Sequence, residues 1–439
     1  MIDITALNRT TKERFLLSMR RRSTQGYPAE EEAVRRIIDD VLKNGDEALF
    51  NYALQYDGCV LTPDNLRITK EQIKDAYRLL DPVLVDVMKE SADNIRRFHE
   101  KQRRTGFDDT SREGIRLGQR ITPLEIAGVY VPGGKAAYPS SVLMNVIPAS
   151  VAGVTRILMT TPASGKAESE GTVAGVSAAT IVAADIAGVT EILRVGGAHA
   201  IAAMAFGTAS VPRVDKITGP GNIYVALAKK AVFGHVSIDS IAGPSEVLVL
   251  ADDTADARFV AADMMAQAEH DEKASAILIT TSMRLAKDVQ KELTVQIEGL
   301  SRKEIISKSL NDYGAIFVAE TMEEAIGCAN EIASEHLEIL TADPEKTMEE
   351  VRHAGAVFLG PYSPEPLGDY YAGPNHILPT NRTARFFSAL GVDDFIKKTS
   401  VIRYEKEQLL AASDRIIRFA EEEGLTAHAR AIALRAEET

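Results

Sequence analysis

The stretch Ala127-Gly-Val-Tyr-Val-Pro132 begins the part of the chain that decides its fold. It is a short β-rich run that ends in proline and glycine before a helical pattern. Similar runs recur along the chain, at 156–161, 191–195, 246–251, 276–280, 315–318 and 356–359. Most are followed by Gly, Pro or Asp and then by a helical pattern, as in the βα units of a parallel sheet. The sequence therefore predicts an α/β fold.

The predicted strands form two groups, so we expect two parallel-sheet α/β domains that resemble incomplete Rossmann folds. The second group of strands, with the early helices packed against it, forms one domain from residues 29–126 and 242–380. The first group forms the other domain, 127–241. Helical patterns predict an N-terminal extension, 1–28, and a C-terminal tail, 381–439. Ligands commonly bind in the cleft between two such domains.

Composition narrows the class of protein. The 439 residues are 45% apolar and 26% charged, with a net charge of −13 and no basic tract, which argues against nucleic acid as a partner. No apolar run is long enough to cross a bilayer, and Met1-Ile-Asp3 does not begin a signal peptide. Cys59 and Cys328 lie in unrelated segments, which excludes a disulfide framework and a cysteine-rich zinc site. These features predict a cytoplasmic protein.

Three glycine-rich loops follow predicted strands and precede helices. They are Val131-Pro-Gly-Gly134, Val195-Gly-Gly197 and Thr218-Gly-Pro-Gly-Asn222. Such loops let backbone N–H groups approach a phosphate at a helix N-terminus. None of them is a GxGxxG, and the acidic residue expected about twenty positions later is missing. Nucleotide binding and tight turns without a ligand therefore both remain open.

Polar residues with catalytic or ligand chemistry gather in the C-terminal half. Gln267 and His270 are three residues apart, so on a helix they would share a face and could bind one ion, although Gln is a rare ligand and a helical His is more often packed or solvated. Glu335 and His336 are adjacent at a predicted helix end, where they could serve two proton transfers or form a surface acid beside a buried histidine. Asp369 lies in a long irregular stretch of the kind that often carries function.

The combination of these motifs resembles histidinol dehydrogenase. The resemblance rests on five blocks that occur in the family's order: Gly243-Pro-Ser-Glu246, Gln267-Ala-Glu-His-Asp271, Ser334-Glu-His-Leu337, Gly368-Asp-Tyr…Gly373-Pro-Asn-His-Ile-Leu-Pro-Thr380 and Glu423-Gly-Leu-Thr-Ala-His428. Matched motifs extend from about Val129 to His428. The resemblance implies a layout like that of aldehyde dehydrogenases. It also implies four-electron oxidation of L-histidinol to L-histidine through an aldehyde, with two NAD+ and one Zn2+ per subunit.

The resemblance also assigns residues to roles. It implies His336 as the general base and Glu335 as the acid that activates water. The implied zinc ligands, which also face the substrate, are Gln267, His270, Asp369 and His428. Other implied substrate contacts are Ser245, His336, His376 and Glu423, and the implied NAD+ contacts are Tyr130, His199 and Asn222. The family forms intertwined homodimers, which implies that Glu423 and His428 complete the partner's site.

Two positions depart from the family pattern. The usual Gly-Gly-Ala-Gln is Gly196-Gly-Ala-His199 here, so we expect a changed NAD+ contact, since histidine can still donate or accept a hydrogen bond. Asn381-Arg382 replaces a usual pair of glycines, which leaves the local loop conformation in question but touches no catalytic position.

Three rival interpretations are weaker. Some relatives of the family oxidise other polar alcohols, but the retained Glu423 and His376 contact the histidinol end. A cysteine-dependent aldehyde dehydrogenase is excluded because neither cysteine lies in a matched motif. A non-enzymatic zinc- or nucleotide-binding module would be expected to lose Glu335, His336 or a ligand, and all are present.

Overall fold

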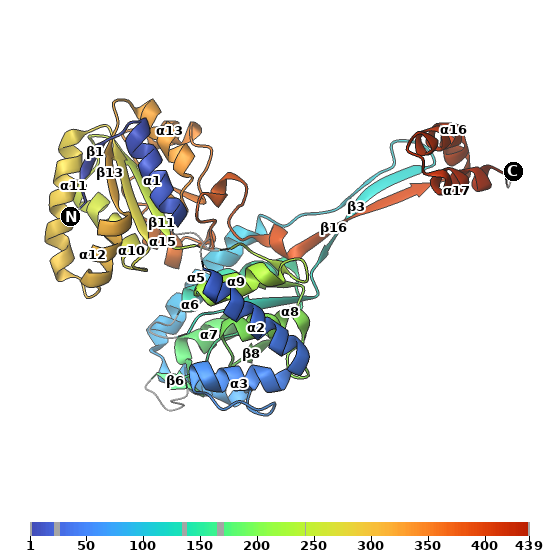
Figure 1. Ribbon diagram of the computed structural model, residues 1–439, viewed down its shortest axis with the longest axis horizontal. Coiled ribbons are helices and arrows are strands. Elements are labelled where there is room, and N and C mark those ends of the chain that lie inside the picture. The colour runs from blue at the N-terminus through green and yellow to red at the C-terminus, as the bar shows by residue number, and fades with distance from the viewer. Residues whose placement is uncertain (1, 22–26, 134–137, 165–170, 242, 438–439) are drawn as a thin grey trace. The chain divides into compact units, whose positions relative to one another are not determined.

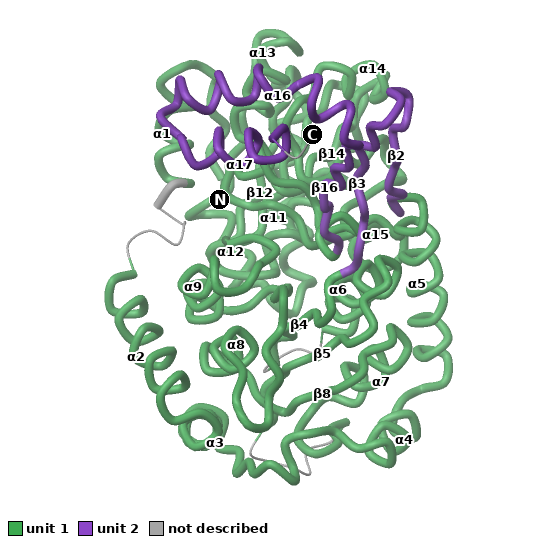
Figure 2. The backbone as a smooth tube through the Cα atoms, turned by 90° about the vertical axis from the view of Figure 1, so that its right-hand side faces the viewer, with its two compact units in different colours: residues 1–102, 124–395 green, residues 103–123, 396–439 purple. Residues whose placement is uncertain are grey.

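The computed structural model describes residues 2–21, 27–133, 138–164, 171–241 and 243–437, and Figure 1 shows their elements. The chain divides into two compact units, which Figure 2 distinguishes by colour. Unit 1 comprises Met1–Gln102 and Leu124–Phe395, and unit 2 comprises Arg103–Pro123 and Ile396–Thr439. In the part of the chain that is described, no helix combines the length and the apolar character needed to cross a membrane.

Unit 1 contains a five-stranded parallel sheet with the strand order β10-β9-β4-β5-β8. Its strands are β4 (Ile126–Tyr130), β5 (Arg156–Thr160), β8 (Glu191–Leu193), β9 (Lys216–Thr218) and β10 (Ser237–Ile238). The crossover helices are α6 (Pro139–Ala152), α7 (Ala178–Ala187), α8 (Gly197–Phe206) and α9 (Ile223–Val232). A small antiparallel pair, β6 (Thr172–Val173) and β7 (Val176–Ser177), precedes α7. The predicted parallel architecture is confirmed here.

Unit 1 also contains a six-stranded parallel sheet with the strand order β1-β13-β12-β11-β14-β15. Its strands are β1 (Ile4–Ala6), β11 (Glu246–Ala251), β12 (Ser275–Thr280), β13 (Ala315–Val318), β14 (His336–Leu340) and β15 (Ala356–Leu359). The helices in this stretch of the chain are α1 (Arg9–Arg21), α10 (Ala257–Ala268), α11 (Met283–Gln296), α12 (Lys303–Tyr313), α13 (Met322–Ile332), α14 (Pro344–Glu349) and α15 (Glu365–Tyr370), with the 3-10 helices η1 (Ile297–Gly299) and η2 (Thr383–Arg385). A third 3-10 helix, η3 (Val392–Phe395), contacts α6 and packs in the core of the five-stranded sheet.

Helices cover both faces of the six-stranded sheet, which explains its continuous apolar strands. Val247 and Val249 of β11 pack with residues of α10, α11 and α12. Leu248 and Leu250, which point to the opposite face, pack with residues of α13. Every residue of β11 is consequently buried, as in sheets with helices on both sides.

The helices before the first predicted strand lie elsewhere than expected. They are α2 (Pro28–Asn44), α3 (Asp46–Asp57), α4 (Lys70–Leu79) and α5 (Pro82–Glu100). Their buried residues share one apolar core with the five-stranded sheet, and α2 contacts α8 and α9. The prediction that they pack against the strands of 246–360 was therefore wrong, because periodicity shows an apolar helix face but not its partner.

Unit 2 is a three-stranded antiparallel sheet followed by two helices. The central strand β3 (Ile115–Pro123) pairs with β2 (Phe107–Asp109) and with β16 (Ile396–Tyr404). The helices α16 (Lys406–Glu422) and α17 (Thr426–Glu437) contact each other. Among the described residues of this unit, only Ser413 and Ala429 are buried. The tail was expected to be helical throughout, but the nine residues of β16 form a strand.

Candidate active site

Glu335 and His336 lie at the amino ends of the central strands of the six-stranded sheet. Helix α13 ends at Ile332, and Ala333 adopts a left-handed conformation (φ 50°, ψ 57°) that redirects the chain into β14. The pair was expected at a helix end, but His336 is instead the first residue of β14, opposite Val247 of β11. Both side chains are buried.

The backbone N–H and carbonyl of one residue of β11, Glu246, hold both side chains of the pair. The backbone N–H of Glu246 donates to Glu335 Oε2 at 2.9 Å, and the carbonyl of Glu246 lies 3.0 Å from His336 Nδ1. Because a carbonyl can only accept, Nδ1 carries the ring proton and Nε2 keeps its lone pair. Glu335 Oε2 and His336 Nδ1 are 3.8 Å apart. The arrangement fixes both the position and the tautomer of His336.

His336 has the protonation state that a general base requires. Burial lowers the pKa of His336 to about 4, although the charge of Asp369 and the bond to Glu246 oppose this shift. Its Nε2 is buried and has no hydrogen-bond partner among the described residues. A neutral imidazole with an available lone pair can accept a proton from a bound alcohol.

Glu335 is shifted in the opposite direction. Burial raises the pKa of the Glu335 carboxyl well above its usual range, and the nearby carboxylates of Glu246 and Asp369 raise it further. The hydrogen bond from the Glu246 backbone only partly offsets these effects. A carboxylate with a raised pKa is a stronger base than an exposed one, which suits proton removal from water.

Three potential metal ligands converge beside this pair. Ligand atoms of His270, Glu365 and Asp369 all lie within 4.8 Å of one another. Glu365 and Asp369 are one turn apart in α15, and His270 follows the end of α10. Burial raises the pKa of Glu365 to about 9, with the Asp369 charge adding to the effect. A group with clustered carboxylates and an imidazole is typical of a cation site.

Gln267 strengthens the fit of this group to a metal ion. It is fully buried in the last turn of α10, and within the described ranges neither of its amide atoms has a hydrogen-bond partner. A buried polar group without a partner is costly, so a ligand that engages the amide oxygen would relieve the cost. The shared helix face predicted for Gln267 and His270 was wrong, since α10 ends at Ala268 and His270 lies beyond it. Zn2+ accepts the nitrogen and oxygen donors of this set.

His376 and Asp369 contact each other within the same group. His376 Nδ1 lies 3.4 Å from Asp369 Oδ1 and 3.2 Å from the Asp369 carbonyl. Burial acts to raise the pKa of Asp369, but the hydrogen bond from His376 and the neighbouring histidines outweigh it, so the pKa lies below its usual value. Asp369 is thus negatively charged and can serve as a metal ligand. Ser245 immediately precedes Glu246, and its carbonyl accepts a hydrogen bond from the N–H of Ser275 at 3.0 Å.

The sequence did not single out Glu365. It lies four residues before Asp369 in the run Ser363-Pro-Glu-Pro-Leu-Gly-Asp369, a spacing that places two carboxylates on one face of a helix. Its backbone N–H donates to Glu338 Oε1 at 2.7 Å, so a second buried acid holds it in place. The i, i+4 spacing was the available signal.

The three residues expected to contact NAD+ lie around the carboxyl ends of the five-stranded sheet. Tyr130 ends β4, and its hydroxyl accepts a hydrogen bond from Gly197 N–H at the start of α8 (3.2 Å). Asn222 caps α9, with Oδ1 accepting from the N–H groups of Tyr224 and Val225. Two of the glycine-rich loops, 195–197 and 218–222, therefore lead into the N-termini of α8 and α9. Gly134 of the third loop lies outside the described residues.

His199, the departure from the family pattern, is buried in the first turn of α8. Its ring centroid lies 5.7 Å from that of Tyr52 and 6.1 Å from that of Tyr56, both in α3. Burial lowers its pKa to about 3, and neither ring nitrogen has a partner in the described part of the chain. His199 is therefore a neutral ring packed against tyrosines.

Glu423 and His428 belong to unit 2. Glu423 directly follows α16, and His428 lies in the first turn of α17. Both residues are exposed. Their participation in the site stays a prediction.

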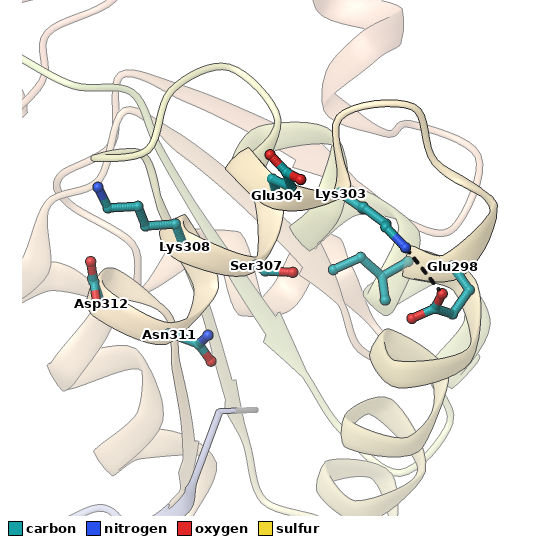
Figure 3. A pocket seen from close by; sticks show the side chains of 8 residues that line it. Glu298, Lys303, Glu304, Ser307, Lys308, Asn311 and Asp312 are labelled. Carbon is teal, nitrogen blue, oxygen red and sulfur yellow. Dashed lines mark hydrogen bonds and ion pairs between the residues drawn. The ribbon is translucent and has the colours of Figure 1, made fainter.

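A separate pocket lies at η1 and α12, with Ile297 at its wall (Figure 3). Two of its lysines are already in ion pairs, Lys303 with Glu298 and Lys308 with Glu272. Its lining residues come from the 297–312 segment, so it does not belong to the Glu335–His336 site.

Comparison with known proteins supplies the family. The family model described as histidinol dehydrogenase matches residues 20–436. The histidinol dehydrogenase of Halalkalibacterium halodurans is 54% identical over 422 residues, covering 96% of this chain and 97% of that protein. That of Geobacillus kaustophilus is 52% identical and covers 96% and 97%. The crystal structure of histidinol dehydrogenase from Elizabethkingia anophelis matches with a TM-score of 0.91 at 34% identity, covering 100% of this chain and 98% of that one.

Proposed function

Because the chain belongs to the histidinol dehydrogenase family and is an oxidoreductase, we propose that it oxidises L-histidinol to L-histidine through L-histidinaldehyde, with Zn2+ and two NAD+. The observation that carries this proposal is the buried Glu335–His336 pair, which the backbone N–H and carbonyl of Glu246 hold in place. Its two members have opposite pKa shifts, so each suits a different proton transfer.

Gln267, His270, Asp369 and, from a second copy, His428 would hold the zinc ion. When bound, it supplies a Lewis-acidic centre that orients the nitrogen atoms of the substrate. The orphaned amide of Gln267 and the anionic Asp369 support this ligand set. Glu365 stands close enough to His270 and Asp369 to hold them in place.

In the first oxidation, His336 Nε2 accepts the hydroxyl proton while the carbon loses hydride to NAD+. The bond from Nδ1 to the Glu246 carbonyl keeps the lone pair of Nε2 directed away from the β11 peptide. For the second oxidation, Glu335 takes a proton from the water that adds to the aldehyde, and the protonated His336 returns its proton to the former aldehyde oxygen, which gives the neutral gem-diol. His336 then accepts a proton from the resulting gem-diol as the second hydride leaves. The products are L-histidine and two NADH per histidinol.

The C-terminal tail would complete the site of a second copy. We assign Glu423 to the substrate ammonium and His428 to the metal of the partner, so that neither copy is active alone. The exposure of both residues on unit 2 supports this assignment.

Counting NADH tests the reaction. The enzyme with limiting L-histidinol and excess NAD+ should release two NADH per substrate, measured by absorbance and by quantifying L-histidine. One NADH per substrate, or none, would overturn the proposal.

Mixing two inactive variants tests the exchange of tails. His336→Ala and His428→Ala should each be inactive, but co-refolded together they should recover about a quarter of wild-type activity, since half of the dimers then contain one intact site. If the mixture stays inactive although heterodimers are isolated, the tail does not act in the partner's site.

A further inference from the structure

Lys229 and Asp239 form a buried ion pair in the part of unit 1 that contains the five-stranded sheet. Lys229 belongs to α9 and Asp239 directly follows β10. Their side chains are only 2% and 6% exposed, and Lys229 Nζ contacts Asp239 Oδ1 directly. Lysine is almost never fully buried unless it is paired, so Asp239 accounts for the burial of Lys229. The role of the buried pair is then the question.

The two partners hold the same residue, Gly219. Lys229 Nζ donates to the Gly219 carbonyl at 2.9 Å, and the Gly219 N–H donates to Asp239 Oδ2 at 2.8 Å. Both backbone polar groups of this glycine are therefore fixed by opposite ends of one ion pair. Asp239 Oδ1 also accepts from the N–H of Ser240 at 2.7 Å, which holds the carboxylate itself.

Gly219 lies where the cofactor residues meet. Its φ is +118°, and a Cβ added there would lie 2.0 Å from the carbonyl oxygen of Tyr130. Three residues later, Asn222 caps α9. Glycine in this region of φ has no intrinsic preference for one conformation, so the loop 218–222 needs outside contacts to keep its shape.

We propose that Lys229 and Asp239 are positioning residues that hold the loop 218–222 against Tyr130 so that the loop can bind NAD+. This inference rests on the proposed function, in which NAD+ is the oxidant, and on the NAD+ contacts that the family resemblance implies for Tyr130 and Asn222. Neither charged group needs to touch the cofactor; they act through the two backbone groups of Gly219. Losing the pair should therefore weaken the binding of NAD+ and NADH far more than it slows the chemistry at saturation.

A second buried lysine provides a matched control. Lys216 begins β9, and its Nζ lies 2.9 Å from Asp394 Oδ1 with the side chain 6% exposed. Because β9 ends at Thr218, Lys216 lies at the opposite end of the strand from the loop. Lys216→Met removes the ion pair of another buried lysine, whose partner Asp394 is 32% exposed, without touching Gly219.

The test uses the zinc-loaded full chain. Lys229→Met combined with Asp239→Asn removes both charges together, so that no uncompensated charge remains buried. Gly219→Ala displaces the same loop with the pair intact and supplies the reference phenotype. The Kd of NADH is measured by fluorescence, and KM for NAD+, kcat and Tm are measured on the same samples.

We expect the double variant to raise the Kd of NADH and KM for NAD+ by roughly tenfold or more, as Gly219→Ala does, with kcat changed by less than about threefold. Lys216→Met should lower Tm comparably and leave the Kd of NADH unchanged. Two results would overturn this inference and leave the proposed function standing. One is a folded double variant that binds NADH as tightly as the wild type does. The other is a Lys216→Met variant whose Kd of NADH rises as much as that of the double variant. If Lys229→Met/Asp239→Asn does not fold, the single variant Lys229→Arg, which keeps the charge but not the geometry of Nζ, must show the same raised Kd. Wild-type protein that binds no NADH at all would overturn the proposed cofactor, and this inference with it.

Discussion

Replacing Gln267 by methionine should stabilise the metal-free protein and weaken its hold on zinc. The Gln267 side chain is fully buried, and among the described residues its amide oxygen and nitrogen both lack partners. Methionine has a similar length and volume but no group that needs a hydrogen bond. The substitution therefore removes an unsatisfied amide without opening a cavity.

The size of the effect follows from the cost of that amide. A buried polar group without a partner costs about 1–3 kcal/mol, so the free energy of unfolding of the metal-free variant should rise by about that amount. The entropy of unfolding of a 439-residue chain is about 0.9 kcal/mol/K, which converts the gain to a rise in Tm of about 1–3 °C.

Zinc should reverse the order of the unfolding temperatures of Gln267→Met and the wild type. A metal present at about a thousand times its Kd adds about 4.1 kcal/mol to the stability of the wild type, which exceeds the roughly 1–3 kcal/mol that the substitution adds to the metal-free protein. A variant that lacks one of the ligands binds the ion more weakly and gains less. Zinc-loaded Gln267→Met should therefore unfold at a lower temperature than zinc-loaded wild type.

Scanning calorimetry of chelator-treated and zinc-loaded samples gives both comparisons. Asn375→Leu is the matched control, because the Asn375 amide is equally buried but donates to the Met144 carbonyl at 2.7 Å and accepts from the Ile377 N–H at 2.8 Å. That variant should lose about 1–3 kcal/mol with or without zinc. If metal-free Gln267→Met is destabilised as Asn375→Leu is, the Gln267 amide is satisfied in solution and the reasoning fails.

Three further predictions concern the remaining site residues. Because burial lowers the pKa of His199 from 6.5 to about 3, the folded state disfavours the protonated ring, and stability falls by about 1.4 kcal/mol per unit as pH drops from 6.5 toward 3. The free energy of unfolding of His199→Gln, measured with urea, should therefore fall by about 2 kcal/mol less than that of the wild type between pH 6.5 and pH 5. Equal decreases in the two proteins would contradict the burial of a neutral ring. Glu335→Gln keeps an acceptor for the Glu246 N–H but cannot take a proton from water, so released NADH should fall from two toward one per histidinol while a carbonyl reagent traps the aldehyde. His336→Ala should release none, and identical failure of both variants at the alcohol step would refute their separate roles. Chelation should abolish activity and leave the Kd of NADH unchanged, with zinc restoring turnover; activity that survives complete removal of the metal would exclude the proposed zinc.

The sequence predicted the parallel sheets because their strands are buried on both faces. A run such as that of β11 is apolar throughout, and local pattern is sufficient to identify it. The same pattern does not identify β16, which contains Lys397, Lys398 and Ser400 and is mostly exposed. That strand is defined by its antiparallel pairing with β3, which is far away in the sequence. The residues of 396–404 alone do not indicate this partner.

The sequence names candidate residues for the site, but it does not show the backbone contacts that hold them. The pair Glu335–His336 was recognised, yet the group that fixes it is the backbone of Glu246, which is 89 residues from Glu335. Reading the pair as a helix end missed β14, because Glu335, His336 and Glu338 interrupt the apolar pattern of a buried strand. Polar residues at the start of a buried strand are themselves a functional signal, since burial without a role would be costly.

The departure at Asn381-Arg382 reaches the site through the backbone. Both residues have left-handed φ values, 53° and 67°, which glycine adopts freely and other residues adopt at a cost of about 1–3 kcal/mol each. Contacts with the rest of unit 1 must therefore offset this cost. Asn381 N–H donates to Glu246 Oε1 at 3.3 Å, and Arg382 Nε donates to the Glu331 carbonyl at 3.1 Å. Glu246 is the residue whose backbone holds Glu335 and His336, so the loop is joined to the support of the candidate catalytic pair through the Glu246 carboxylate.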